Sequence, residues 1–187
     1  SMPLTIDQTG PSIGCNADVS VSNDPGLCSA IVNLPTPPAA DDCGILSVEG
    51  LRSDGLALDD PYPAACDPGN TVMVTWTATD IAGHETSCVQ TVTVTDDEGP
   101  TLTVSDDIIA YADGGGVSAV IDYPAPVVDD NCDPDPSVDC VPPSGSVFPL
   151  GITEVTCTAT DECGNTTIDT FSVQVLEQAE CFLVIGD

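Results

Sequence analysis

The sequence predicts an all-β protein made of two tandem β-sandwich domains that are stabilised by disulfide bonds. Three observations point to this fold class: apolar and polar residues alternate with period two, one residue pattern occurs twice, and the chain has 10 cysteines. Alternation with period two gives a strand one buried face and one exposed face. Short strands separated by turns, in units of about 80–90 residues, are typical of a β-sandwich.

The clearest alternation covers residues 72–79, VMVTWTAT, where one face is apolar and the other is mostly threonine. We expect Trp76, on the apolar face, to lie in the core. Residues 91–95, TVTVT, repeat the pattern, and turn residues follow such runs, as in NDPG at 23–26 and DPGN at 67–70. The 17 prolines, and the lack of a capped segment with helical periodicity, leave no room for a substantial helix.

The chain contains an internal repeat. Residues 10–43 match residues 99–132 at an offset of 89 positions, and residues 68–94 match residues 149–175 at an offset of 81. The first copy is therefore 8 residues longer between Cys43 and Pro68. We expect two domains and a C-terminal tail with an apolar strand, at residues 8–97, 98–177 and 178–187.

The charge of the chain is strongly one-sided. Thirty-one acidic residues face one basic residue, Arg52, and the net charge is −30. A nucleic-acid-binding protein needs cations to displace counterions from phosphates, so that class is excluded. Docking on an anionic membrane is also disfavoured. The charge suits a soluble chain that binds divalent cations, and adaptation to high salt gives the same composition.

The cysteines indicate an oxidising compartment. The sequence has no CxxC motif and one histidine, His84, so zinc ligation is a weaker explanation than disulfide bonds. We therefore expect an extracellular or cell-surface location. The longest apolar stretch, residues 181–185, is far too short to cross a bilayer, so we expect no membrane insertion.

Both copies carry a set of short motifs. The first copy has DPG at 24–26, DDCG at 41–44 and VMVTWTATD at 72–80, and the second has DNC at 130–132, FPLG at 148–151 and VTCTATD at 155–161. With these motifs, each copy resembles the HYR (hyalin repeat) family of immunoglobulin-like extracellular modules. Two departures are His84, where asparagine is usual, and Val104 and Val117 in place of Cys15 and Cys28. The resemblance implies an immunoglobulin-like fold and an adhesive or structural spacer module among many others. It does not identify a ligand.

The repeat constrains the disulfide pairing. Cys15 and Cys28 are both absent from the second copy, as a bonded pair would be, so we predict that they bond to each other. The remaining predicted pairs follow from the expected places in the sandwich: Cys43–Cys88, Cys132–Cys163 and Cys140–Cys157. Cys66 and Cys181 stay unassigned, as free thiols, a pair, or bonds between molecules.

Carboxylates gather where the two domains meet in sequence, which suggests a calcium site. Three segments supply the candidate ligands: the linker at 96–98, the loop at 129–135 and the turn at 161–162. These ligands are Asp96, Asp97, Glu98, Asp129, Asp130, Asp133, Asp135, Asp161 and Glu162. Ca²⁺ prefers several oxygen ligands from flexible loops. The first copy has a thinner version of the set: Asp7, Asp41, Asp42 and Asp80. The alternative is a solvated acidic surface screened by salt.

No arrangement of catalytic residues is evident. His84 occupies a turn position, no serine lies in a GxSxG elbow, and no glycine-rich phosphate loop opens a helix. We therefore expect a non-catalytic adhesion or spacer module without an organic cofactor, whose partners are neighbouring domains or copies of itself. Two alternatives are a filament subunit that assembles head to tail through residues 181–185, and a carbohydrate-binding module, for which aromatic residues are few.

Overall fold

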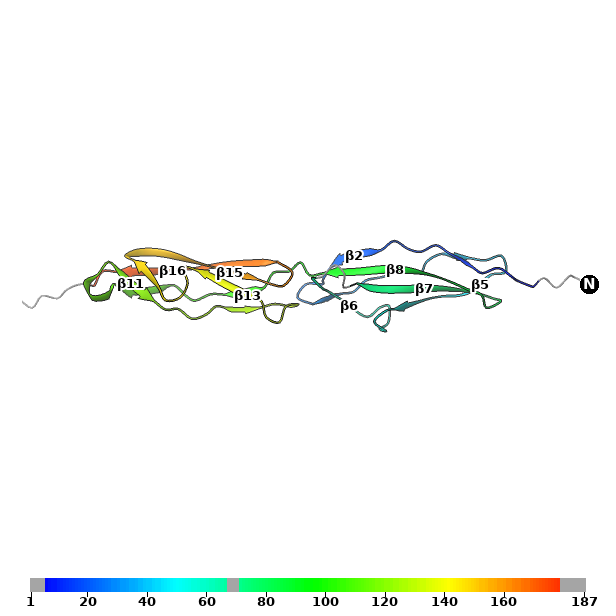
Figure 1. Cartoon of the computed structure of the whole chain (residues 1–187), viewed down its shortest axis with the longest axis horizontal. Coiled ribbons are helices and arrows are strands. Elements are labelled where there is room, and N and C mark those ends of the chain that lie inside the picture. Colours follow the sequence, from blue (N-terminus) through cyan, green and yellow to red (C-terminus); the bar gives the residue numbers. More distant parts are fainter. Residues whose placement is uncertain (1–5, 67–70, 179–187) are drawn as a thin grey trace, which may run out of the picture. The chain divides into compact units, whose positions relative to one another are not determined.

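The computed structural model describes residues 6–66 and 71–178 and is all-β, which confirms the fold class expected from the sequence. The chain divides into two compact units, Ser1–Asp97 and Glu98–Asp187 (Figure 1). Within the described ranges, the helical structure is one 3₁₀ turn, η1 (Asp113–Gly115). None of the described segments forms a helix that is long and apolar enough to cross a membrane. The predicted tail strand at 181–185 lies outside the described residues.

Unit 1 is a sandwich around a four-stranded sheet in the order β2-β8-β7-β5, and two short pairs, β3-β6 and β1-β4, complete it. Its strands are β1 (Ser12–Ile13), β2 (Val19–Ser22), β3 (Ser29–Ala30), β4 (Ala39–Ala40), β5 (Ile45–Arg52), β6 (Tyr62–Pro63), β7 (Val72–Asp80) and β8 (Glu85–Thr95).

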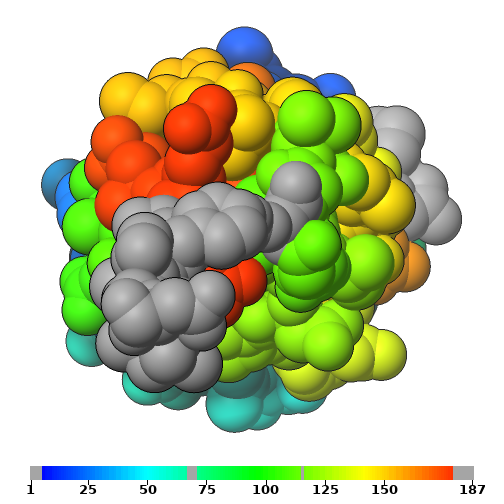
Figure 2. All heavy atoms as spheres, turned by 90° about the vertical axis from the view of Figure 1, so that its left-hand side faces the viewer, coloured from blue at the N-terminus to red at the C-terminus, as the bar shows by residue number. Residues whose placement is uncertain are grey.

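Unit 2 has the same arrangement, with a four-stranded sheet in the order β10-β16-β15-β13 and the pairs β11-β14 and β12-β9. Its strands are β9 (Thr101–Thr103), β10 (Ile108–Tyr111), β11 (Ser118–Ile121), β12 (Val127–Asp129), β13 (Ser137–Val141), β14 (Ser146–Pro149), β15 (Gly151–Thr160) and β16 (Thr166–Leu176). Figure 2 shows one face of this unit, where residues near the end of β16 (red) and residues around β10 and β11 (green) reach the surface.

The first strand of each main sheet pairs in parallel with the last strand of its unit. Val19 lies opposite Val92 in β8, and Ile108 lies opposite Val173 in β16. The other neighbours in these sheets are antiparallel. Parallel pairing needs a long connection between the two strands, and here the whole sandwich supplies it. A strand from the start of each unit therefore lies beside the last strand of that unit in the same sheet, as in an immunoglobulin-like fold.

The alternating residues place the core as predicted. In β7, buried residues alternate with more exposed ones, and Trp76 is almost completely buried. Its indole Nε1–H donates to Oε1 of buried Gln90 at 3.0 Å, and Nε2 of Gln90 donates to the carbonyl of Ala17 at 2.7 Å. These bonds satisfy the polar atoms that the core encloses. In unit 2 the rings of Tyr123 and Phe171 pack edge to face with centroids 5.0 Å apart.

The extra residues of the first copy form a loop that is organised by Arg52. The loop begins at the end of β5, and the Arg52 guanidinium is fully buried. It donates to the Asp54 carboxylate and to the carbonyl oxygens of Ala57, Asp60 and Pro61. It also stacks on Tyr62, with its central carbon 3.8 Å from the ring centroid. The one basic residue of the chain is therefore structural.

Two of the predicted disulfide pairs are wrong. The structure bonds Cys15 to Cys88, which excludes both Cys15–Cys28 and Cys43–Cys88. Cys43 carries a free, exposed thiol. The reason is the place of Cys15, which comes just after β1, a strand that packs beside β8. The sulfur of Cys28 lies at the β3-β6 pair, 3.9 Å from the carbonyl of Ala64.

The remaining cysteines are also oxidised where the structure describes them. Cys140 of β13 bonds to Cys157, its antiparallel partner in β15, which is the pair that the sequence predicts. Cys28, Cys66, Cys132 and Cys163 are each disulfide-bonded. Cys66 is therefore not a free thiol, and Cys181 lies outside the described residues.

Candidate cation sites

The turn between β15 and β16 and the loop after β12 bring two acidic residues of unit 2 together. Carboxylate oxygens of Asp130 and Asp161 lie within 4.8 Å of each other. Asp161 is buried, and its oxygens accept bonds from the backbone N–H of Asn165 at 2.8 Å and from its Nδ2 at 2.9 Å. Oδ1 of Asp130 accepts from the backbone N–H of Cys132 and of Asp133.

One carboxylate oxygen of this pair is left unsatisfied in the described part of unit 2. Oδ2 of Asp130 is buried and has no hydrogen-bond partner among the described residues. A buried carboxylate oxygen without a donor is costly unless a donor or a cation satisfies it. Among the residues that the sequence predicts as calcium ligands, Asp130 is therefore one with a buried oxygen that lacks a hydrogen-bond partner in the described part of the chain.

The other predicted ligands differ in their surroundings. Asp129, Asp135 and Glu162 are exposed, and Oδ1 of Asp133 accepts a bond from the backbone of Asp135. None of these four belongs to an acidic group found within the described residues.

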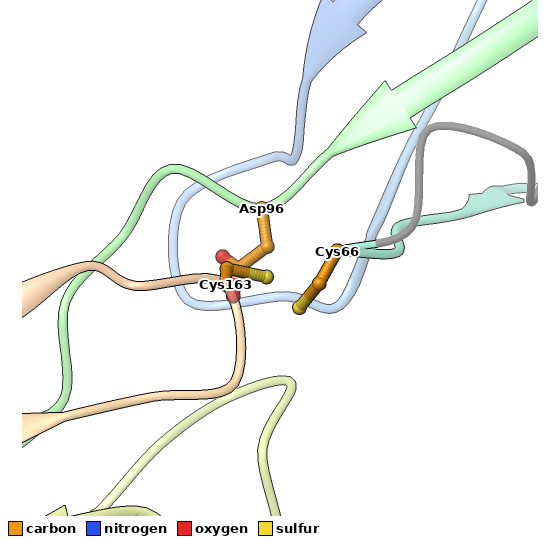
Figure 3. Close-up of side chains that lie close together, drawn as sticks. All are labelled: Cys66, Asp96 and Cys163. Atoms are coloured by element: carbon orange, nitrogen blue, oxygen red, sulfur yellow. The ribbon is translucent and has the colours of Figure 1, made fainter.

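Three of the predicted ligands come from the linker. Asp97 is exposed, and its carboxylate accepts a bond from the Ser22 hydroxyl at 2.6 Å. Asp96 directly follows β8, is buried, and lies near Cys66 in unit 1 (Figure 3). Since Cys66 and Cys163 are both in disulfides, neither sulfur is a thiolate that could bind a metal. Glu98 is the first residue of unit 2.

Unit 1 carries the equivalent group at the turn between β7 and β8. Asp80 is completely buried, and its oxygens accept a bond from the backbone N–H of His84 at 2.9 Å and contact His84 Nδ1 at 2.8 Å. The bond to Asp80 raises the pKa of His84. Burial acts to raise the pKa of Asp80, but the hydrogen bonds from His84 outweigh it and lower the pKa. A carboxylate oxygen of Asp7 lies within 4.8 Å of both side chains.

Asp7 also belongs to a second acidic group, with Asp41, Asp42 and Cys43. Oδ1 of Asp7 accepts bonds from the backbone N–H and hydroxyl of Thr9, each at 3.0 Å, and the backbone bond lowers the pKa of Asp7. Oδ2 of Asp7 is buried and has no hydrogen-bond partner among the residues described. Desolvation and the neighbouring carboxylates, with that of Asp7 foremost, raise the pKa of the Cys43 thiol.

A pocket of about 370 Å³ opens beside this group. It is lined by Ile6, Asp7, Gln8, Thr9, Asp42 and Cys43. The first unit therefore has the four acids that the sequence suggests. It adds an imidazole and a free thiol, which the sequence predicts in a turn and in a disulfide. The sequence carries a sign of this imidazole, because the first copy has His84 at the position where the second copy has Asn165.

Comparison with known proteins identifies one family. The HYR domain model matches residues 95–175. Hyalin of Strongylocentrotus purpuratus is 29% identical over 163 residues, which cover 86% of this chain and 13% of that protein. Hyalin of Lytechinus variegatus is 36% identical over 112 residues, which cover 58% of this chain and 21% of that protein. The chain therefore spans less than a quarter of the length of either relative.

Solved structures with a related arrangement are more distant. Human protocadherin-24 EC1-2 is 15% identical, with a TM-score of 0.41, and the match covers 90% of this chain and 100% of that chain. Drosophila N-cadherin EC1-4 is 14% identical, with a TM-score of 0.44 and coverage of 90% and 50%. An I-band fragment of titin, I67-I69, is 13% identical, with a TM-score of 0.42 and coverage of 91% and 67%.

The family pattern quoted from the second copy, at residues 130–132, 148–151 and 155–161, lies within the matched range. The match covers residues 95–175, so this part of the chain, which forms most of unit 2, is similar to HYR domains.

Proposed function

We propose that the chain is a non-catalytic structural and adhesive segment of a larger extracellular protein, in which it joins neighbouring domains or further copies of itself. The observation that carries the proposal is the family match together with its coverage. Most of this chain aligns with hyalin, yet the aligned part is 13% of that protein. A segment that resembles a small part of a long extracellular chain fits a repeated module.

The chemistry of the chain supports this function. The disulfides Cys15–Cys88 and Cys140–Cys157 fit an oxidising environment. Each unit has its own apolar core, so each resists unfolding without a partner domain. The charge of −30 keeps such segments soluble at high density.

A bead assay tests the adhesive part of the proposal. Beads coated with the purified chain should aggregate with one another in calcium, and chelation should disperse them. The matched control is the same chain after reduction and alkylation, which removes the fold but not the charge. Beads that stay dispersed in calcium, although the attached chain is folded, would contradict homotypic adhesion.

We place a calcium ion, within this proposal, at the pole of unit 2 that carries Asp130 and Asp161. The further ligands are drawn from the unit 2 residues that the sequence suggests, which are Glu98, Asp129, Asp133, Asp135 and Glu162. Carboxylates are the hard oxygen donors that Ca²⁺ prefers, and the unpartnered Oδ2 of Asp130 is the atom that a cation would satisfy. The ion would supply charge neutralisation and stiffness, and no chemical step.

Calorimetry tests the calcium site. Chelated protein should bind Ca²⁺ with a rise in melting temperature, and the double variant Asp130→Asn, Asp161→Asn should lose most of that rise. Asp169→Asn, in the exposed part of β16, is the matched control and should behave as the parent. An equal calcium response in the double variant would remove the ion from these residues.

A further inference from the structure

We infer that unit 1 binds a divalent transition-metal ion of the zinc class, through His84, Asp7 and Asp80. This site is separate from the calcium site proposed for unit 2, and it does not rest on that proposal. The two sites differ in their unit, their donor atoms and the cation that each prefers.

The first support is the geometry of the three side chains. A ring nitrogen of His84 and carboxylate oxygens of Asp7 and Asp80 lie within 4.8 Å of one another. In a tetrahedral zinc site with bonds of about 2.1 Å, ligand atoms are about 3.4 Å apart. Small side-chain movements therefore suffice to bring the three donors onto one ion.

The second support is the way in which His84 is held. Asp80 is completely buried and fixes both the backbone and the ring of His84, while the ring remains 42% exposed to solvent. The contact between Nδ1 of His84 and Oδ2 of Asp80 already holds the ring beside a carboxylate oxygen that can share the ion. The imidazole is thus positioned by the core and accessible from outside.

The third support is the unsatisfied atom. Oδ2 of Asp7 is buried without a hydrogen-bond partner among the described residues, and the pocket of about 370 Å³ lies on the same side chain. The Arg52 guanidinium cannot serve this oxygen, because it is bound in its own loop. The pocket gives a hydrated ion a route to Asp7.

The comparison of the two units explains the choice of metal. Unit 2 has Asn165 where unit 1 has His84, and both side chains make the same bonds to the preceding aspartate. Unit 2 also has the bonded Cys132 where unit 1 has the free thiol of Cys43, which lies within 4.8 Å of Asp7. Imidazole favours Zn²⁺ over Ca²⁺, whereas carboxylates alone favour Ca²⁺. Among the described residues of these two acidic groups, the imidazole and the free thiol therefore belong to unit 1 alone.

The decisive variant is His84→Asn, because Asn165 shows that this turn folds with asparagine. Isothermal titration of chelated protein with Zn²⁺ alone should show one site that is at least about tenfold weaker in the variant. The Ca²⁺ response should be unchanged, so the failure of either site would be seen separately. Equal Zn²⁺ affinity in parent and variant would overturn the inference.

A second measurement does not depend on a variant. His84 is the one histidine of the chain, so its ring resonances in an NMR spectrum are assigned without ambiguity. Saturation with Zn²⁺ should shift the ring nitrogen resonance that coordinates, whereas saturation with Ca²⁺ should not. A ring spectrum that Zn²⁺ leaves unmoved would show that the ion, if bound, lies elsewhere.

Discussion

At the scale of single residues, the pair of His84 and Asp80 makes unit 1 sensitive to pH in a way that unit 2 is not. The bond to Asp80 raises the pKa of His84 above 6.5. The stabilisation from protonated His84 is therefore complete below pH 6.5 and is lost as the pH rises through the folded pKa. The lowered pKa of Asp80 acts in the opposite sense, because its contribution is complete above pH 3.8 and is lost as the pH falls.

Both contributions are present between these two values, so the pair stabilises most between pH 3.8 and 6.5. We predict that the free energy of unfolding of the parent, relative to His84→Asn, falls as the pH rises above 6.5. Denaturant titrations of both proteins in chelator, at a series of pH values, measure this difference. A difference that does not vary with pH would mean that folding does not shift the pKa of His84.

At the scale of elements, the loop between β5 and β6 depends on one guanidinium. Arg52 holds the loop through the Asp54 carboxylate and three backbone carbonyl oxygens, and it stacks on Tyr62. A lysine has the same charge but cannot make this planar array of bonds. We predict that Arg52→Lys lowers the free energy of unfolding by about 2–3 kcal/mol. Chemical denaturation measures it, and a loss of under about 0.5 kcal/mol would contradict it.

The two known disulfides close loops of different length, and this predicts different contributions to stability. Cys15 and Cys88 are 73 residues apart, whereas Cys140 and Cys157 are 17 residues apart. From the entropy of loop closure, the long bridge should contribute about 4 kcal/mol and the short one about 3 kcal/mol. Double alanine variants of each pair, compared by denaturant titration, measure the two contributions. A larger loss for Cys140–Cys157 would contradict the entropic explanation.

The strands and the core could be read from the sequence, and the bridge of unit 1 could not. Period-two alternation fixes which residues of β7 face inward, and Trp76 lies there as expected. The pairing argument relied on cysteines that disappear together in the second copy. Cys88 also disappears, since Asp169 stands in its place, so the rule could not choose between Cys28 and Cys88 as the partner of Cys15. That choice depends on the packing of β1 against β8, which no local pattern encodes.

The candidate sites show the same limit. The sequence suggested that the acids at each pole would come together, and the carboxylates of Asp130 and Asp161 do so because adjacent loops of a sandwich end at the same pole. The sequence did not reveal the buried Oδ2 atoms of Asp7 and Asp130, since the satisfaction of a single atom depends on side-chain geometry. It also did not reveal the role of His84, because the sequence assigns His84 to a turn and does not show that its ring contacts the candidate ligand Asp80.

At the scale of the whole molecule, the charge of −30 sets how stability should depend on salt. Thirty-one acidic side chains repel one another, and the one arginine is occupied in its loop. Self-repulsion is greater in the compact state than in the unfolded chain, and added salt screens it. We therefore predict that the melting temperature rises with NaCl concentration in the presence of chelator. Each gain of about 1 kcal/mol would appear as a rise of about 4–8 °C in a domain of this size.

Differential scanning calorimetry over a series of NaCl concentrations measures this effect, and the choice of salt provides the control. Chelated samples exclude divalent ions, so a rise in NaCl reports on screening alone. Salts of excluded ions such as sulfate also strengthen apolar burial, whereas NaCl at moderate concentration acts mainly by screening. A melting temperature that stays constant or falls as NaCl rises would show that the acids are spaced widely enough for water to screen them. In that case, neutralisation of the net charge could not be what bound cations contribute, and any calcium effect would have to come from particular atoms such as Oδ2 of Asp130.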